Sequence, residues 1–246
     1  MYIIRKMKRK MRIAIIGYGK MGHMIEDVAR SRGHEIVARI DVGDAFDLKG
    51  ADVAIEFTTP ATAKDNILRA WAQGVPVVCG STGWKPEELK GEGLELKEVD
   101  SKKLIVESKT GKVMLVWSSN YSVGVNIFFE LNKFLAEQMT AQTQYMPSIK
   151  EIHHIHKLDK PSGTAKTLAE QIRETDLSRY RNIEDIEIES VREGEVPGTH
   201  EVTWDSEEDT IVITHIAKGR RGFALGAVLA AEMLALSPDD VILTTH

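Results

Sequence analysis

The stretch "RIAIIGYGKMG", Arg12 to Gly22, decides the fold of the first half of the chain. An apolar run leads into a G-x-G-x-x-G turn, and the residues that follow carry apolar side chains at helical spacing. In a dinucleotide-binding unit Gly17 permits the tight turn, Gly19 lets a pyrophosphate approach the backbone, and Gly22 allows helix and strand to pack closely. The helix start adds free N–H groups and a positive dipole end. The stretch therefore predicts a strand, a phosphate-binding turn and a helix.

An acidic residue stands where this interpretation needs one. Asp41 ends "EIVARID", about 20 residues beyond the turn, where a carboxylate can bond the ribose hydroxyls of a dinucleotide. A strand-end aspartate that caps a turn is the alternative. "GSTGW", Gly80 to Trp84, and "SSNYS", Ser118 to Ser122, follow later apolar runs, at strand ends where such folds bind ligands. Either could be an ordinary loop, but the position favours the nicotinamide end of the cofactor.

The rest of the chain divides into two patterns. Short apolar runs alternate with helical segments as far as Asn120, which predicts a parallel sheet covered on both faces, although the polar segment Lys85 to Lys112 gives no assignment. Beyond Asn120 come a helix, the extended stretch "IKEIHHIHK", a second helix, three runs with short turns that suggest an antiparallel sheet, and a last apolar helix. We expect an α/β protein: a Rossmann-like domain over residues 12–120, completed by the helix 221–246, and an α+β substrate and oligomerisation domain with a mainly antiparallel sheet over residues 121–220.

Composition excludes several classes of protein. The chain of 246 residues is 42% apolar and 28% charged, as in an ordinary globular protein. Its formal charge of -5 leaves no basic surplus for a general nucleic-acid binder. No apolar run approaches the ~20 residues that cross a bilayer, and the basic start "MYIIRKMKRKM" lacks the apolar stretch of a signal peptide. The single cysteine, Cys79, is interpreted as a small core residue. We expect a cytoplasmic protein with no nucleic-acid or membrane partner.

The stretch "EIHHIHKLDKPSGTA", Glu151 to Ala165, concentrates groups that handle protons and bind anions. A metal site, a proton relay and an exposed polar strand edge would each explain part of it. In an extended strand His154 and His156 face one way while His153 and Lys157 face the other. The three imidazoles then do not converge, so a metal would need ligands from elsewhere.

The same alternation permits a catalytic interpretation. His153 and Lys157 would lie on one face, about 13 Å apart along a straight strand at ~3.3 Å per residue, and could bracket a small substrate. Histidine suits general-acid work near neutral pH, and lysine can bind a carboxylate. Ser162, Gly163 and Thr164 then open a helix, whose N–H groups and hydroxyls make a second anion site. These groups together favour a small acidic substrate.

This stretch closely resembles the signature E-x-H-H-x-x-K-x-D-x-P-S-G-T-A of the 4-hydroxy-tetrahydrodipicolinate reductase (dihydrodipicolinate reductase) family, which acts in the diaminopimelate route to lysine. The resemblance spans nearly the whole chain through "IAIIGYGKMG", "GSTGW", "SSNYSVGVN" and "GFALGAVLAA". The histidine signature is long and very specific, whereas the glycine turn is not.

The resemblance implies an oxidoreductase that reduces 4-hydroxy-tetrahydrodipicolinate to tetrahydrodipicolinate with NADH or NADPH and needs no metal. His153 would be the general acid and Lys157 its cationic partner, while His154, Gly163 and Thr164 would bind the dicarboxylate substrate. Family members are homotetramers joined through the sheet of the second domain, here residues 186–217. The residues expected to contact the cofactor are Gly17, Tyr18, Gly19, Lys20, Met21, Gly22, Asp41, Gly80, Ser81, Thr82, Ser118, Ser119, Asn120 and Tyr121.

Some features depart from the family pattern. The glycine turn is one residue shorter than in some members, the segment Lys85 to Lys112 matches poorly, and Lys160 replaces a frequent alanine. Asp41 favours the unphosphorylated cofactor, but Lys20 and Arg39 could reach a 2′-phosphate, so we expect a modest NADH preference. Three alternatives stay open: another two-domain dehydrogenase such as an aspartate dehydrogenase, a non-catalytic dinucleotide sensor, and a metal-binding module.

Overall fold

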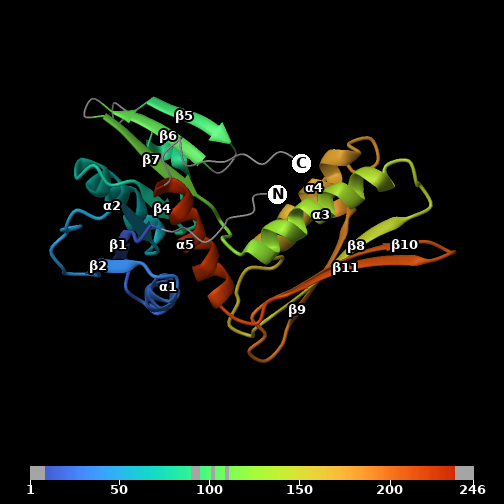
Figure 1. The fold of residues 1–246 in the computed structure, drawn as a ribbon. Coiled ribbons are helices and arrows are strands. Elements are labelled where there is room, and N and C mark those ends of the chain that lie inside the picture. Colours follow the sequence, from blue (N-terminus) through green and yellow to red (C-terminus); the bar gives the residue numbers. More distant parts are fainter. Residues whose placement is uncertain (1–8, 90–94, 101–102, 109–110, 236–246) are drawn as a thin grey trace. The chain divides into compact units, whose positions relative to one another are not determined.

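The structure is a computed structural model that describes residues 9–89, 95–100, 103–108 and 111–235 (Figure 1). It divides into two compact units. The first contains Met1–Ser122 and Phe223–His246, and the second contains Val123–Gly222. None of the described helices combines the length and the apolar composition that a membrane span requires.

The first unit is built on a sheet with the strand order β2-β1-β3-β4-β7-β6-β5. The first five strands in this order are parallel, as predicted. One apolar cluster joins the sheet to α2, and a second joins its other face to α1 and α5, so helices cover both faces. The parallel strands are β1 (Arg12–Ile16), β2 (Glu35–Ile40), β3 (Val53–Glu56), β4 (Val77–Cys79) and β7 (Gly111–Trp117), and the helices are α1 (Lys20–Ser31), α2 (Pro60–Ala72) and α5 (Arg221–Ala235). The predicted continuation of the last helix beyond Ala235 lies outside the described residues.

The segment that the sequence left unassigned extends this sheet. After the short helix η1 (Pro86–Leu89), β5 (Glu95–Asp100) and β6 (Lys103–Ser108) form an antiparallel pair, and β6 lies antiparallel to β7. The sequence of β5, ELKEVD, is mostly charged, and that of β6, KLIVES, contains an apolar run of only three residues. Because both strands are short and neither alternates apolar and polar residues regularly, they do not stand out as strands from the sequence alone.

The second unit packs two helices, α3 (Val123–Met139) and α4 (Gly163–Thr175), around a core that includes sheet residues. The sheet has the order β11-β10-β8-β9. Its strands are β8 (Met146–His153), β9 (Glu187–Arg192), β10 (Thr199–Asp205) and β11 (Thr210–Ile216), and a short helix η2 (Ile183–Asp185) precedes β9.

The expectation that three successive strands pair side by side is wrong for β9. The strands β10 and β11 do form an antiparallel hairpin, but β8 lies between β10 and β9 and pairs with β9 in parallel. The strand β8 buries alternate residues up to His153. In the centre of the sheet its backbone groups are paired along both edges, so none of its polar backbone groups has to be left unpaired beside the core. The sheet is still mainly antiparallel.

The extended stretch was also predicted too long. The strand β8 ends at His153, and the amide of Lys157 donates to the carbonyl of His154 at 3.1 Å in a turn. Its ladder partner β9 ends at Arg192, directly opposite His153, so there is no further strand to pair with. The separation of about 13 Å between His153 and Lys157, which assumed a straight strand, therefore does not apply.

Candidate active site

The glycine turn between β1 and α1 has the geometry that the sequence predicted. Gly17 has a φ of 90°, and a Cβ there would lie 2.1 Å from the carbonyl oxygen of Phe57. A Cβ on Gly22 would lie 2.4 Å from the carbonyl oxygen of Gly17, so only glycine allows helix and strand this close. A Cβ on Gly19 would meet no atom within 4 Å, which leaves open space at the helix N-terminus. These features fit a dinucleotide pyrophosphate.

Asp41 follows β2 as an exposed residue and already takes part in a turn. Its Oδ1 accepts a hydrogen bond from the amide of Val42 at 2.9 Å, and its own amide donates to Oδ2 of Asp44 at 2.9 Å. The turn-capping alternative is therefore present in the structure. It does not exclude ribose binding, because a carboxylate offers several acceptor positions.

The loops after β4 and β7 lie at the same edge of the sheet, since these parallel strands are neighbours. Ser81 is buried and its Oγ accepts from the amide of Thr58 at 2.8 Å. The hydroxyl of Tyr121 lies 2.9 Å from the carbonyl oxygen of Cys79 and 2.8 Å from that of Val116, and burial raises its pKa well above the usual value. The Tyr121 hydroxyl thus links the carbonyl groups of β4 and β7, so a cofactor at this edge of the sheet would contact other atoms.

Cys79 lies in the core, as expected. It is fully buried, and its Sγ donates to Oε2 of Glu56 at 2.9 Å. Burial and the nearby carboxylate raise the pKa of the thiol far above its usual range. A thiol held protonated in this way is a poor nucleophile.

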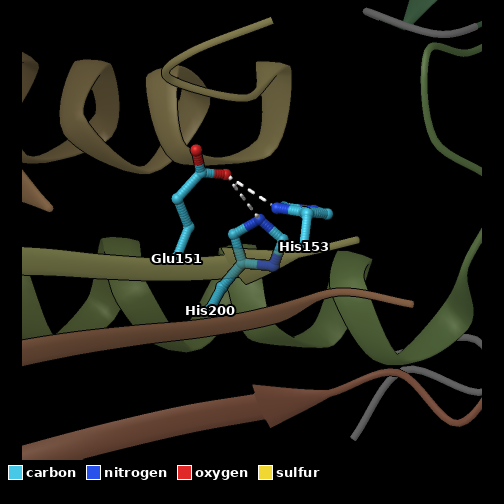
Figure 2. Close-up of side chains that lie close together, drawn as sticks. All are labelled: Glu151, His153 and His200. Carbon is cyan, nitrogen blue, oxygen red and sulfur yellow. Dashed lines mark ion pairs between the residues drawn. The ribbon is translucent and has the colours of Figure 1, made fainter. Parts of the chain in front are cut away.

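In the second unit three side chains converge on the buried face of the sheet (Figure 2). Glu151 and His153 are two residues apart on β8, and His200 on β10 lies opposite Glu151 in the antiparallel register. The Nδ1 atom of His153 lies 3.0 Å from Oε2 of Glu151, an ion-pair distance without the alignment of a hydrogen bond. The Nε2 atom of His200 lies 3.8 Å from the same oxygen, and the two imidazole rings meet edge to face.

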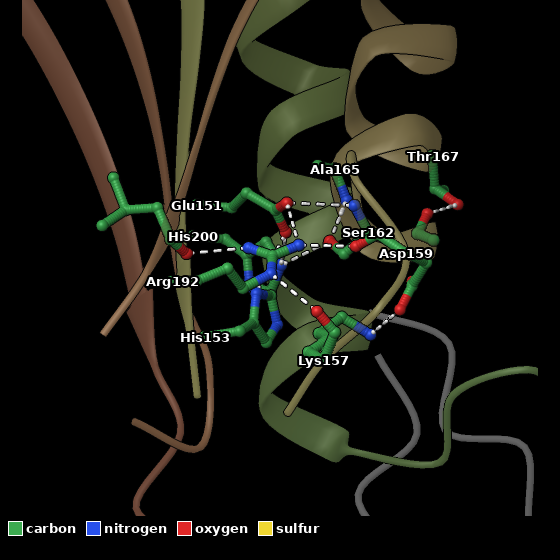
Figure 3. Close-up of polar contacts among 11 residues, drawn as sticks. Glu151, His153, Lys157, Asp159, Ser162, Ala165, Thr167, Arg192 and His200 are labelled. Atoms are coloured by element: carbon green, nitrogen blue, oxygen red, sulfur yellow. Dashed lines mark hydrogen bonds and ion pairs between the residues drawn. The ribbon is translucent and has the colours of Figure 1, made fainter. Parts of the chain in front are cut away.

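The other oxygen of Glu151 is held by two donors (Figure 3). Its Oε1 accepts from the amide of Ser162 at 3.1 Å and from Nη2 of Arg192 at 3.1 Å. Burial opposes the charge of Glu151, but its contacts with His153 and Ser162 outweigh burial and hold its pKa well below the ordinary value. Glu151 is therefore an anion beneath His153. A carboxylate at Nδ1 of a histidine fixes the orientation of the ring and leaves Nε2 as its other polar atom.

His200 is the neutral member of the cluster. Burial, and then the proximity of His153, lower its pKa to about 4. Its Nε2 lies 3.2 Å from Oγ of Ser162. Near neutral pH His200 is therefore uncharged and does not compete for the negative charge of Glu151, which lies against His153.

Gly198 keeps one edge of His153 open. Its φ is 148°, and a Cβ there would lie 3.1 Å from Nε2 of His153. A side chain at this position would crowd the nitrogen that points away from Glu151. No role was predicted from the sequence for Gly198, Glu151, Arg192 or His200.

Lys157 lies in the turn after β8 and belongs to the same polar cluster (Figure 3). Its Nζ is 2.8 Å from Oδ1 of Asp159, and its carbonyl oxygen accepts from Nε of Arg192 at 3.2 Å. Burial opposes the charge of Asp159, but the ammonium of Lys157 holds its pKa below the ordinary value. The turn thus brings Lys157 and His153 into one polar cluster, although the two residues do not lie on one straight strand.

The helix α4 begins beside Glu151 and presents open amides. Ser162 is its N-cap, with Oγ accepting from the amide of Ala165 at 3.2 Å. Since its hydroxyl and amide are both engaged inside the protein, the predicted anion site is left to the next two residues. In the described chain the amides of Gly163 and Thr164 have no hydrogen-bond partner, and a Cβ on Gly163 would meet no atom within 4 Å. These amides at a helix start suit a carboxylate.

The three histidines of the motif do not converge, as the alternation predicted. His154 and His156 have ring centroids 6.0 Å apart, and His156 is exposed and pairs with Glu195 at 3.2 Å. Among the residues that the structure describes, the group placed to hold a metal is Glu151, His153 and His200, whose candidate ligand atoms lie within 4.8 Å of one another. The guanidinium of Arg192 on the same carboxylate disfavours a second cation there.

Comparisons with known proteins agree along the whole chain. Two family models match: "Dihydrodipicolinate reductase, N-terminus" over residues 44–121 and "Dihydrodipicolinate reductase, C-terminus" over residues 124–245. The chain is 45% identical over 233 residues to the 4-hydroxy-tetrahydrodipicolinate reductase of Christiangramia forsetii, covering 91% of this chain and 92% of that one. It is 34% identical over 259 residues to the same-named protein of Archaeoglobus fulgidus, covering 92% and 94%.

A solved structure supports the fold. The dipicolinate-bound dihydrodipicolinate reductase from Paenisporosarcina sp. TG-14 superposes with a TM-score of 0.67 at 21% identity, covering 92% of this chain and 95% of that one. At this level of identity the match concerns the fold alone.

Proposed function

The chain belongs to the dihydrodipicolinate reductase family, and from this premise we propose that it reduces 4-hydroxy-tetrahydrodipicolinate to tetrahydrodipicolinate with NADH or NADPH in the diaminopimelate route to lysine. The observation that carries the chemistry is the pairing of His153 with the buried anion Glu151, beside the open amides of Gly163 and Thr164. A non-catalytic dinucleotide sensor gives no reason for a proton donor and an anion site in one cluster.

The residues of the second unit have separate tasks in this reaction. The amides of Gly163 and Thr164 bind one substrate carboxylate, and Lys157 supplies a cation for the acidic substrate, with His154 a further contact. The 4-hydroxyl group leaves as water, and His153, which holds a proton at Nε2, delivers it to the substrate once the hydride has been added. Glu151 lies with its negative charge against Nδ1 of the same ring. When bound, the reduced nicotinamide supplies the hydride.

The first unit supplies the cofactor site. The amides around Gly19 receive the pyrophosphate and Asp41 receives the ribose, which supports a modest preference for NADH. No residue of this scheme requires a metal, since the carboxylates are held by cations and amides.

We also propose a cytoplasmic homotetramer joined through the sheet of the second unit. Large apolar side chains that the structure leaves exposed on this sheet support the assembly: Met146, Ile211, Val212 and Ile216. Light scattering of the purified protein measures the mass of the assembly directly.

The test of the function is the loss of reduced-cofactor absorbance after addition of the freshly made condensation product of pyruvate and aspartate semialdehyde. His153→Gln should lower kcat by about 10²-fold or more, because general acids contribute about 10²–10⁴. Cofactor binding should stay near wild type. A wild-type protein that binds NADH but shows no turnover would support the sensor, and a His153→Gln variant with full kcat would remove the proposed acid.

A further inference from the structure

Glu26 of α1 lies at the centre of a charged cluster that no motif marks. The residue is only 8% exposed, and its two carboxylate oxygens receive donors from three side chains. Arg39 reaches it with both Nε, at 2.7 Å from Oε2, and Nη2. Arg30 donates from Nε at 2.7 Å, and the hydroxyl of Tyr18 donates as well. The pKa of Glu26 is lowered to about 2, first by Arg39, so the carboxylate stays charged.

This cluster joins the two parts of the unit that border an adenosine ribose in dinucleotide-binding folds. Tyr18 belongs to the glycine turn, and Arg39 lies two residues before Asp41 at the end of β2. In such folds an acid at this strand end binds the 2′-hydroxyl, while a nearby arginine accommodates a 2′-phosphate. Arg39 is therefore placed to receive that phosphate, yet its guanidinium is committed to Glu26.

The surroundings of Asp41 add negative charge rather than positive. Asp44 bonds the amide of Asp41 through its own carboxylate, so two carboxylates stand at the strand end. To meet a 2′-phosphate there, Arg39 would have to leave Glu26 buried with fewer donors, and the loss of a donor to a buried carboxylate is costly.

We propose that Glu26 is a specificity-determining residue of this enzyme: by holding the guanidinium of Arg39 in a two-pronged pair, it withholds one of the two cations near the strand end, Arg39 and Lys20, from a 2′-phosphate and so favours the unphosphorylated cofactor. This rests on the proposed use of a nicotinamide dinucleotide. Glu26 acts through Arg39 and touches neither substrate nor reacting atoms, so it is a positioning residue.

The test compares NADH and NADPH in Glu26→Gln, which keeps the size of the side chain but removes its charge. We expect kcat/KM for NADPH to rise about tenfold while kcat/KM for NADH changes by less than about threefold. A merely structural role for Glu26 would lower both values together. Adding Arg39→Ala to Glu26→Gln should abolish the gain with NADPH, because the released cation is then missing.

Asp27→Asn is the matched control, since it removes one negative charge from the next residue of α1, which is exposed. Its NADPH-to-NADH ratio should equal that of the wild type. An unchanged ratio in Glu26→Gln, an equal shift in Asp27→Asn, or a wild type that already favours NADPH tenfold would each overturn the proposal.

Calorimetric binding of NADH and NADPH to the same variants needs no turnover. If the chain failed to reduce the proposed substrate, the binding ratio would still decide the role of Glu26. Failure of the proposed function and failure of this inference are therefore separate results.

Discussion

Replacing Glu151 by glutamine removes the negative charge beneath His153 and keeps an acceptor for the amide of Ser162. The lost partner lies 3.0 Å from Nδ1 of His153. A contact between opposite charges at this distance is worth several kcal/mol at an effective dielectric constant of about 20, so its loss should affect the proton-delivery step assigned to His153. We expect the fall of kcat at the alkaline end of the pH range to begin at a lower pH in the variant than in the wild type, because the negative charge beside the proton donor is gone.

The assay is kcat with saturating substrate from pH 5 to pH 9. The pH at which kcat falls does not depend on what fraction of the variant protein is folded. The matched control is Glu195→Gln, because Glu195 also pairs with a histidine, His156 at 3.2 Å, but both side chains are exposed. That variant should keep the wild-type profile. A Glu151→Gln profile that falls in height but keeps its midpoint would refute the proposed effect of the charge and leave Glu151 a structural role only.

Further predictions follow from other contacts. Lys157→Ala should lower kcat and raise substrate KM, whereas the exposed Lys166→Ala on α4 should change neither. Gly163→Val should raise substrate KM strongly at unchanged thermal stability, since its Cβ meets open space, and pyridine-2,6-dicarboxylate should compete with substrate in the wild type only. Glu232→Ala should lower the free energy of unfolding, measured in denaturant titrations, by about 3–5 kcal/mol. The variant leaves Arg32 and His34 without the buried carboxylate, from which they lie 2.7 Å and 2.8 Å. Burial opposes the charge of Glu232, but Arg32 and His34 hold its pKa below 4.5, so its contribution to stability should be full above that pH and lost as the pH falls below it. Chelation should leave activity unchanged, and metal analysis of active enzyme should find less than stoichiometric metal. A loss of activity on chelation that added zinc restored would contradict the metal-free scheme, and Glu151, His153 and His200 would then be the first ligands to test.

The fold of the first unit was predictable because its signals are local. A strand, a glycine turn and a helix follow one another directly, and the positive φ of Gly17 and the closeness of Gly22 to the turn are consequences of that order. The family assignment, which the comparisons confirm, likewise came from continuous stretches of sequence, the most specific of which is the histidine signature. The strands β5 and β6 were missed because they are short and do not alternate apolar and polar residues regularly.

What the sequence did not predict depends on contacts between distant residues. The place of β8 between β10 and β9 is a matter of pairing, and the same pairing brings His200 opposite Glu151. Glu151 itself was within reach, because it precedes His153 by two residues and therefore shares its face of the strand. Ser162 was assigned to the substrate from its type, but a serine at that position is equally a helix cap, and its hydroxyl and amide serve the fold.

In both units a buried carboxylate lies against a basic side chain, but the proposed consequence for ligand chemistry differs. In the second unit the buried carboxylate of Glu151 lies against His153, the proposed proton donor. In the first unit the buried carboxylate of Glu26 lies against Arg39 and occupies a cation that a phosphorylated cofactor could use. The sequence motifs identify the residues that would face the ligands, but the two buried glutamates are identified only by the contacts that the fold creates. We therefore expect Glu151→Gln to change the pH dependence of turnover and Glu26→Gln to change cofactor choice, although the assigned role of each glutamate is exerted through the residue that it holds.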